Sequence, residues 1–199
     1  MTKVKICGLQ YLQEIDYVNE LKPDYIGFAF AKSRWQITKE HAITLSMSLD
    51  DNITSIGVFV DETAKIVGSY AEHGVIDMIQ LHGQENEAYL AHLRDFTEHE
   101  IIQAFSIQSE DDIKRAMESS ADYILLDSQN PGSGVTFDWC LVNQIPRPFF
   151  LAGGLTPENV TTAINRLQPY AVDVCSGVEE KGVKNKEKIA SFIRRIRHV

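Results

Sequence analysis

Eight short runs of β-branched and aromatic residues alternate with eight longer amphipathic stretches, and this alternation limits the possible folds more than any other feature. The short runs predict strands over residues 4–9, 25–30, 53–60, 78–82, 101–107, 123–127, 149–154 and 172–177. The amphipathic stretches predict helices over residues 11–21, 39–49, 62–73, 86–96, 110–119, 138–143, 158–167 and 187–197. Thr38, Ser109 and Thr156 stand before three of these stretches, where a hydroxyl can cap a helix.

Uninterrupted strand-then-helix units favour a parallel sheet, because each parallel strand needs a crossover connection. Closing eight such strands into a ring removes both sheet edges, so we predict a single α/β domain over residues 1–199, a (β/α)8 TIM barrel. The alternative is an open doubly wound sheet, which six units already fill. At 199 residues the barrel is short, since about 250 are typical of the fold.

The charge and cysteine content argue against several kinds of partner. The formal net charge is −9 and no basic stripe offsets it, so nucleic acid is not an expected partner. The three cysteines are far apart and form no CxxC pair, which indicates neither a disulfide framework nor a zinc site. No apolar signal core follows Met1 and no stretch reaches spanning length, so we expect a cytoplasmic protein without membrane contact.

Two residues at strand ends could exchange protons with a substrate. The carboxyl ends of barrel strands surround one mouth, and catalysis takes place there. Cys7 lies at the end of the first predicted strand and Asp127 at the end of the sixth, so both could reach one ligand from opposite sides. A thiolate accepts a proton and a carboxylic acid donates one when their pKa values lie near neutrality. Taken alone, a lone cysteine such as Cys7 is usually a small buried hydrophobe, and an Asp that ends an apolar run, such as Asp127, is usually a turn or cap residue.

Glycines after the seventh and eighth strands predict a phosphate site. Gly153 and Gly154 precede Thr156 and a helix-opening proline, so free N–H groups and a helix dipole meet at the barrel mouth. Ser176 and Gly177 after the eighth strand complete the cup, and barrels often bind phosphate at this place. Because the net charge is negative, we expect a phosphorylated substrate to be held by these local groups rather than by a general positive field.

Several motifs at the strand ends occur together and in order. They are Lys5-Ile6-Cys7-Gly8, Gln80-Leu81-His82-Gly83, Leu126-Asp127, Gly132-Ser133-Gly134 with Phe137-Asp138-Trp139, and the segments 152–160 and 172–179. With these motifs the chain resembles the phosphoribosylanthranilate isomerase family of tryptophan biosynthesis over nearly its whole length. The resemblance implies a barrel, a small phosphosugar–anthranilate substrate, and no metal or organic cofactor. We expect a monomer or homodimer, and the sequence does not distinguish the two.

The resemblance also implies a reaction and the residues that perform it. In that family an Amadori rearrangement converts N-(5′-phosphoribosyl)anthranilate to 1-(2-carboxyphenylamino)-1-deoxyribulose 5-phosphate. Carried over, Asp127 is the general acid that protonates the furanose ring oxygen, and Cys7 is the general base that removes the proton from carbon 2 of the sugar. The remaining implied ligands are Gly153, Gly154, Ser176 and Gly177 for the phosphate, Asp173 for the sugar hydroxyls, His82 in the pocket wall, and Gly132 and Gly134 in a loop beside the substrate.

Two positions depart from the family pattern. The family usually has serine, any residue, then an arginine that meets the anthranilate carboxylate, whereas this chain has Ser33-Arg34-Trp35. Either Arg34 supplies the carboxylate pair from one position earlier while Trp35 stacks on the aromatic ring, or the contact is weakened. Cys175 replaces a serine that is common before Ser-Gly, a nearly isosteric change that weakens one donor.

Two other functions stay open at this point. Isomerases that serve both histidine and tryptophan synthesis resemble a form with aspartate at the first strand end, and Cys7 argues against that reading. The displaced Arg34 leaves room for a non-catalytic phosphate-binding barrel. Turnover of phosphoribosylanthranilate alone indicates the tryptophan-pathway isomerase, and turnover of the histidine-pathway aminoaldose as well indicates the dual isomerase. Turnover of neither indicates the non-catalytic barrel.

Overall fold

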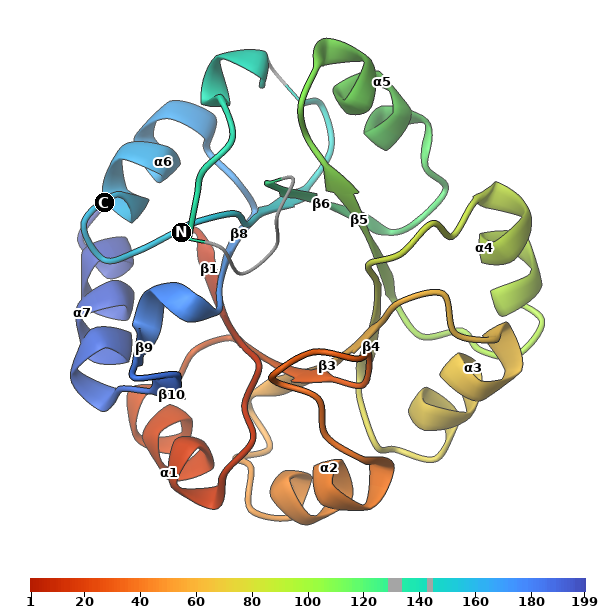
Figure 1. Ribbon diagram of the computed structural model, residues 1–199, viewed down its shortest axis with the longest axis horizontal. Helices are drawn as coiled ribbons and strands as arrows, with labels where there is room; N and C mark the ends of the chain where they lie inside the picture. The colour runs from red at the N-terminus through yellow and green to blue at the C-terminus, as the bar shows by residue number, and fades with distance from the viewer. Residues whose placement is uncertain (129–133, 143–144) are drawn as a thin grey trace.

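The computed structural model describes residues 1–128, 134–142 and 145–199, and its centre is a closed ring of eight parallel strands (Figure 1). The strands are β1 (Lys3–Cys7), β2 (Tyr25–Ala29), β3 (Thr54–Phe59), β4 (Met78–Leu81), β5 (Ile101–Ser106), β6 (Tyr123–Asp127), β7 (Phe149–Leu151) and β8 (Ala171–Val174). Each strand pairs with its neighbours in sequence, and β1 also pairs with β8. The ring confirms the predicted (β/α)8 barrel and excludes the open doubly wound sheet.

Helices surround the ring in Figure 1 and follow the predicted stretches, with ends that are shorter by a few residues. They are α1 (Leu12–Leu21), α2 (Lys39–Ser46), α3 (Ala64–Glu72), α4 (Glu87–Leu93), α5 (Glu110–Glu118), α6 (Val160–Leu167) and α7 (Lys186–Arg197). The Thr38 hydroxyl accepts a hydrogen bond from the His41 N–H at 3.2 Å, which confirms that cap. At Ser109 the cap is reciprocal, because the Asp112 carboxylate accepts from the Ser109 N–H and hydroxyl.

Two connections differ from the predicted pattern. Between β6 and β7 the described part of the chain holds only a single 3-10 turn, η1 (Trp139–Leu141), where a helix over 138–143 was predicted, and residues 143 and 144 lie outside the described residues. Pro146 and Pro148 follow closely, and proline lacks the N–H that would continue a helix. After β8, a 3-10 turn η2 (Ser176–Val178) leads into a hairpin of β9 (Glu179–Glu180) and β10 (Val183–Lys184). Strands of two residues are too short for an alternating pattern to predict.

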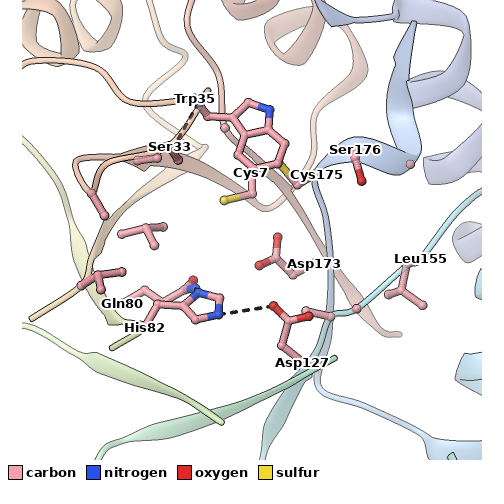
Figure 2. A pocket seen from close by; sticks show the side chains of 18 of the residues that line it. Cys7, Ser33, Trp35, Gln80, His82, Asp127, Leu155, Asp173, Cys175 and Ser176 are labelled. Atoms are coloured by element: carbon pink, nitrogen blue, oxygen red, sulfur yellow. Dashed lines mark hydrogen bonds and ion pairs between the residues drawn. The ribbon is translucent and has the colours of Figure 1, made fainter. Parts of the chain in front are cut away.

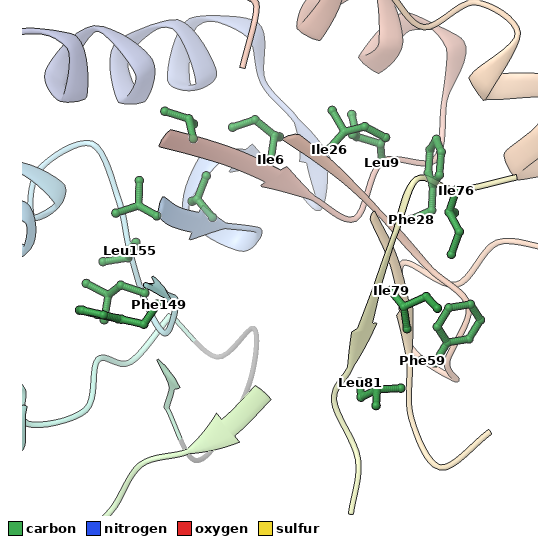
Figure 3. Close-up of a cluster of buried hydrophobic side chains, with 14 of the residues drawn as sticks. Ile6, Leu9, Ile26, Phe28, Phe59, Ile76, Ile79, Leu81, Phe149 and Leu155 are labelled. Carbon is green, nitrogen blue, oxygen red and sulfur yellow. The ribbon is translucent and has the colours of Figure 1, made fainter. Parts of the chain in front are cut away.

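The strands are buried on both faces, and their side chains enter two separate apolar layers in turn. Side chains that point outward, such as Ile6, Ile26 and Ile79, pack under the helices in the cluster that Figure 3 shows. A second cluster, including Ile56, Leu125 and Phe150, forms a separate apolar layer of strand residues. Successive strand residues face opposite sides, so the residue two positions after each member of this second cluster also faces the inside of the ring. A packed interior therefore supports the polar side chains at the mouth.

In the described chain, no helix has the length and apolar character that crossing a membrane requires.

Candidate active site

A cavity of about 250 Å³ opens where the carboxyl ends of the strands meet, and Figure 2 shows the side chains around it. We call it the mouth cavity. Its lining includes eight of the residues singled out in the sequence: Cys7, His82, Asp127, Gly153, Gly154, Asp173, Ser176 and Gly177. They come from β1, β4, β6, β7 and β8 or from the loops that follow these strands. The fold thus gathers residues up to 170 positions apart into one small volume.

Cys7 and Cys175 lie side by side in the mouth cavity. The pairing of Ile6 with Val174 places the next residues, Cys7 and Cys175, on adjacent strand ends. A hydrogen bond from the Cys175 thiol, assisted by the positive charge of Lys5, lowers the pKa of Cys7 to about 7, although burial opposes the shift. The same hydrogen bond, together with burial, raises the pKa of Cys175 well above its usual value. Cys7 is therefore the thiol that ionises near neutral pH and can serve as a base.

Cys175→Ala is expected to make the Cys7 thiol less reactive at neutral pH. The variant removes the donor that contributes most to the lowered pKa of Cys7, so less thiolate is present at pH 7. We expect alkylation of Cys7 by iodoacetamide at pH 7, followed by peptide mass spectrometry, to slow by about threefold to tenfold. Cys140→Ala, at an exposed cysteine, is the control and leaves the rate unchanged. An unaltered rate in Cys175→Ala would contradict this role of the second thiol.

Asp127 ends β6 and is almost completely buried, with 5% of its surface exposed. Its Oδ1 accepts a hydrogen bond from the Ser128 N–H at 2.7 Å. Its Oδ2 lies 3.3 Å from Nε2 of His82, the contact drawn as a dashed line in Figure 2. That contact is close but not aligned, because the buried His82 Nε2 has no geometrically acceptable hydrogen-bond partner in the described part of the chain. Asp127 thus faces the cavity with one oxygen that is not firmly bonded.

A polar layer lies directly beneath these groups. The Lys5 ammonium is fully buried and donates to Asp173 Oδ2 at 2.9 Å and to Gln80 Oε1. The second Asp173 oxygen, Oδ1, is buried and has no hydrogen-bond partner among the described residues. Since Asp173 lines the mouth cavity, this oxygen is free to accept a hydrogen bond from a bound hydroxyl.

The loops after β7 and β8 form an anion cup. Gly153 and Gly154 have φ values of +82° and +62°, a backbone region that side chains other than glycine rarely adopt. A Cβ at Gly177 would lie 1.9 Å from the Leu155 carbonyl oxygen, so only glycine lets the two loops approach this closely. The N–H groups of Gly153, Gly154, Ser176 and Gly177 donate to no acceptor within the described residues. Unpaired N–H groups that converge on one space are suited to bind a phosphate.

Arg34, the predicted carboxylate ligand, lies outside the lining of the mouth cavity. Its Nη2 donates to Glu179 Oε2 at 2.7 Å, and its guanidinium lies 4.3 Å from the Trp35 ring centre. The Trp35 Nε1–H donates to the other Glu179 oxygen at 2.6 Å, and the indole lines the cavity above Cys7 in Figure 2. Lys32, which was not predicted as a ligand, is the lysine that lines this cavity.

The predicted substrate loop is only partly described. Gly132 lies outside the described residues. Gly134 has a φ of +79° and does not line the mouth cavity. Its carbonyl oxygen lies 2.8 Å from where a Cβ of Gly154 would stand, so the loop after β6 packs against the anion cup.

Sequence reasoning missed the polar layer of Lys5 and Gln80 and the donor role of Cys175. A signal for two of them was present, because Lys5 and Gln80 each stand between two apolar strand residues at a position that faces inward. A charged residue in such a position needs a buried partner. The identity of that partner is not readable from the strand itself. Glu179, which holds Arg34 and Trp35, carried no signal of this kind.

Comparisons with known proteins give the context of this site. The family model for N-(5′-phosphoribosyl)anthranilate (PRA) isomerase matches residues 4–195. A relative from Clostridium kluyveri named N-(5′-phosphoribosyl)anthranilate isomerase is 43% identical over 201 residues, covering 100% of both chains. The crystal structure of phosphoribosyl anthranilate isomerase from Thermotoga maritima matches with a TM-score of 0.90 and 35% identity over 100% of both chains. A crystal structure of such an isomerase in complex with reduced 1-(o-carboxyphenylamino)-1-deoxyribulose 5-phosphate matches with a TM-score of 0.88 and 34% identity, again over 100% of both chains.

Proposed function

Because the chain belongs to the N-(5′-phosphoribosyl)anthranilate isomerase family, we propose that Cys7 and Asp127 are the base and the acid of its rearrangement. The enzyme converts the phosphoribosylated anthranilate to the aminoketose in tryptophan biosynthesis. The observation that carries the proposal is the arrangement of the mouth cavity. A thiol with a pKa of about 7 and a buried carboxyl group both line a cavity that also holds the anion cup.

The first step opens the sugar ring. Asp127 in its protonated form gives its proton to the furanose ring oxygen. The bond between carbon 1 and the ring oxygen breaks, and the nitrogen lone pair forms the iminium. Asp127 is left as a carboxylate, and the Ser128 N–H at 2.7 Å together with the nearby His82 ring stabilise that charge.

The second step moves a hydrogen from carbon 2. The Cys7 thiolate takes the proton, and the electrons of the broken C–H bond form a double bond between carbons 1 and 2 while the iminium nitrogen becomes neutral. The cationic nitrogen makes this proton acidic, so a thiolate is a strong enough base. The enolamine then becomes the ketone by loss of the proton on oxygen 2 and protonation of carbon 1.

The rest of the mouth cavity orients the substrate between these groups. We place the phosphate in the anion cup and a sugar hydroxyl on the unpaired Oδ1 of Asp173. The anthranilate ring then faces the apolar side of the cavity, which Ala29 of β2, Val58 of β3 and Trp35 after β2 form. A cytoplasmic location and a monomeric or homodimeric state remain predictions.

A fluorescence assay tests the proposal directly. Purified protein mixed with phosphoribosylanthranilate is expected to abolish the fluorescence of that substrate at a rate proportional to enzyme concentration. The histidine-pathway aminoaldose serves as the second substrate, and we expect no appreciable turnover of it. Tight binding of the product with no loss of substrate fluorescence would instead support a non-catalytic barrel.

Lys32 is expected to contribute more to anthranilate binding than Arg34. We propose that Lys32 meets the carboxylate, because it lines the cavity and has no ion-pair partner among the described residues, whereas Glu179 holds Arg34. Removing a charge-assisted hydrogen bond costs about 1.5 to 3 kcal/mol, so KM of Lys32→Ala should rise by about tenfold or more with little change in kcat. Arg34→Ala is the matched variant on the same loop and should raise KM less. A larger KM effect in Arg34→Ala would return the role to that residue.

A further inference from the structure

A continuous row of buried polar contacts runs beneath the mouth cavity from Asp173 to Asp127. Lys5 Nζ donates to Asp173 Oδ2 at 2.9 Å and to Gln80 Oε1. The amide nitrogen of Gln80 lies 3.0 Å from Nδ1 of His82, and the opposite ring nitrogen of His82 lies 3.3 Å from Asp127 Oδ2. The row therefore joins the side of the cavity that holds Cys7 to the proposed general acid.

The donors in this row fix the direction of every contact. An ammonium group can only donate, so the atom of Gln80 that contacts Lys5 must be its carbonyl oxygen. The Gln80 amide nitrogen therefore points at the histidine, and it too can only donate. Nδ1 of His82 must accept and carries no proton. The single ring proton then lies on Nε2, on the side of Asp127.

We propose that Gln80, held by Lys5, is a positioning residue that keeps His82 neutral, with its N–H directed at Asp127. This inference rests on the proposed function, in which Asp127 must hold a proton before ring opening. A positively charged His82 would form an ion pair with the Asp127 carboxylate and keep it deprotonated. It would need a proton on Nδ1, and that proton would meet the Gln80 amide hydrogens. Rotation of the amide is opposed because Lys5 would lose one of its two acceptors and face the amide hydrogens instead.

The same arrangement stabilises the Asp127 carboxylate that forms after proton transfer. In the resting site the His82 Nε2–H is close to Asp127 but not aligned with it, as described above. When Asp127 becomes a carboxylate, a small movement aligns this N–H with the new negative charge. Hydrogen bonds in empty catalytic sites are often long and tighten only during the reaction. Neutral His82 thus stabilises the product of proton transfer without an ion pair in the starting state.

Nuclear magnetic resonance of 15N-labelled histidine tests the inference without any measurement of activity. Long-range 1H–15N spectra distinguish the Nε2–H tautomer, the Nδ1–H tautomer and the cation by the shifts of the two ring nitrogens. The signal of His82 is identified by its loss in His82→Gln. We expect the wild-type protein at pH 7 to show His82 as the Nε2–H tautomer. A cationic ring or an Nδ1–H tautomer would overturn the proposal, even if the enzyme is active.

Gln80→Glu replaces the donor that faces His82 with a carboxylate oxygen. The carboxylate still accepts from Lys5, but it also accepts from Nδ1, so His82 should carry a proton on Nδ1, as the Nδ1–H tautomer or as the cation. We expect kcat to fall by about tenfold to 100-fold, the range found when a metal-bound histidine loses the partner that fixes its tautomer, with KM changed by less than about threefold. An Nε2–H tautomer of His82 in this variant, or an unchanged kcat alongside a proton on Nδ1, would refute the proposed role.

Gln103→Glu is the matched control. Gln103 on β5 is also buried and bonded at both ends, to the Glu85 carbonyl and the Ser119 hydroxyl, but it does not line the mouth cavity. This variant should leave the His82 signal and kcat unchanged while introducing the same new carboxylate.

Gln80→Met, which loses both hydrogen bonds without adding charge, should give a mixture of His82 tautomers and an intermediate kcat. A single Nε2–H tautomer in Gln80→Met would show that Gln80 does not select it.

Discussion

Asp127→Asn is expected to lower kcat by about 10²-fold to 10⁴-fold, the usual contribution of a positioned general acid. An amide has nearly the same shape and its oxygen can still accept the Ser128 N–H, but it cannot give a proton to the ring oxygen. The loss should therefore appear in kcat and kcat/KM together, with little change in KM. Turnover is measured by the decay of substrate fluorescence, and thermal unfolding shows whether the barrel is intact.

Asp122→Asn is the control for this result. Asp122 stands immediately before β6, at the opposite end from Asp127, and pairs with Arg94 on the surface. It carries the same chemical change outside the mouth cavity, so kcat should stay within about twofold of wild type. Near-normal turnover by Asp127→Asn would remove Asp127 from its proposed role.

Cys7→Ala is expected to be at least as damaging, with a loss of about 10²-fold to 10⁴-fold in kcat. The variant removes the proposed base and its hydrogen bond to Cys175, and burial still acts to raise the pKa of the remaining Cys175 thiol. Cys7→Ser should behave similarly, because a hydroxyl does not ionise near pH 7. Cys140→Ala is the matched control, since this exposed thiol lies outside the mouth cavity. Activity of Cys7→Ala within about tenfold of wild type would refute the assignment.

The pH dependence of kcat/KM for the wild-type enzyme should show the ionisation of Cys7. Cys7 is active as the thiolate, and its pKa is lowered to about 7, so kcat/KM should fall about tenfold for each pH unit below about pH 7. Because Cys7 and Cys175 share a hydrogen bond, the observed value belongs to the pair. In Cys175→Ala the rising limb should move to higher pH, and in Cys7→Ala the residual activity should lack it.

The sequence alone determined the barrel and most of the mouth. Alternating strand and helix patterns specify eight parallel units, and closure follows because it removes the unpaired edges. Chemically distinctive residues at strand ends, such as Cys7, Asp127 and Gly153, were therefore predicted to meet, since all carboxyl ends of parallel strands lie on one side of the ring. Strand ends themselves were predicted too long. For example, β7 ends at Leu151 because Gly153 and Gly154 adopt positive φ.

Only the tertiary structure decided which side chains bond to which. Arg34 lies next to the position where a carboxylate ligand was predicted, yet its partner is Glu179, 145 residues away. The closure of β1 against β8 and the width of the ring make neighbours of Lys5, Gln80 and Asp173. Neither feature can be read from the sequence of one strand. Local patterns record which face of an element is buried, because burial has a short period along the chain. The partner of a buried polar group depends on distances across the closed ring, so it is settled only when all eight strands are in place.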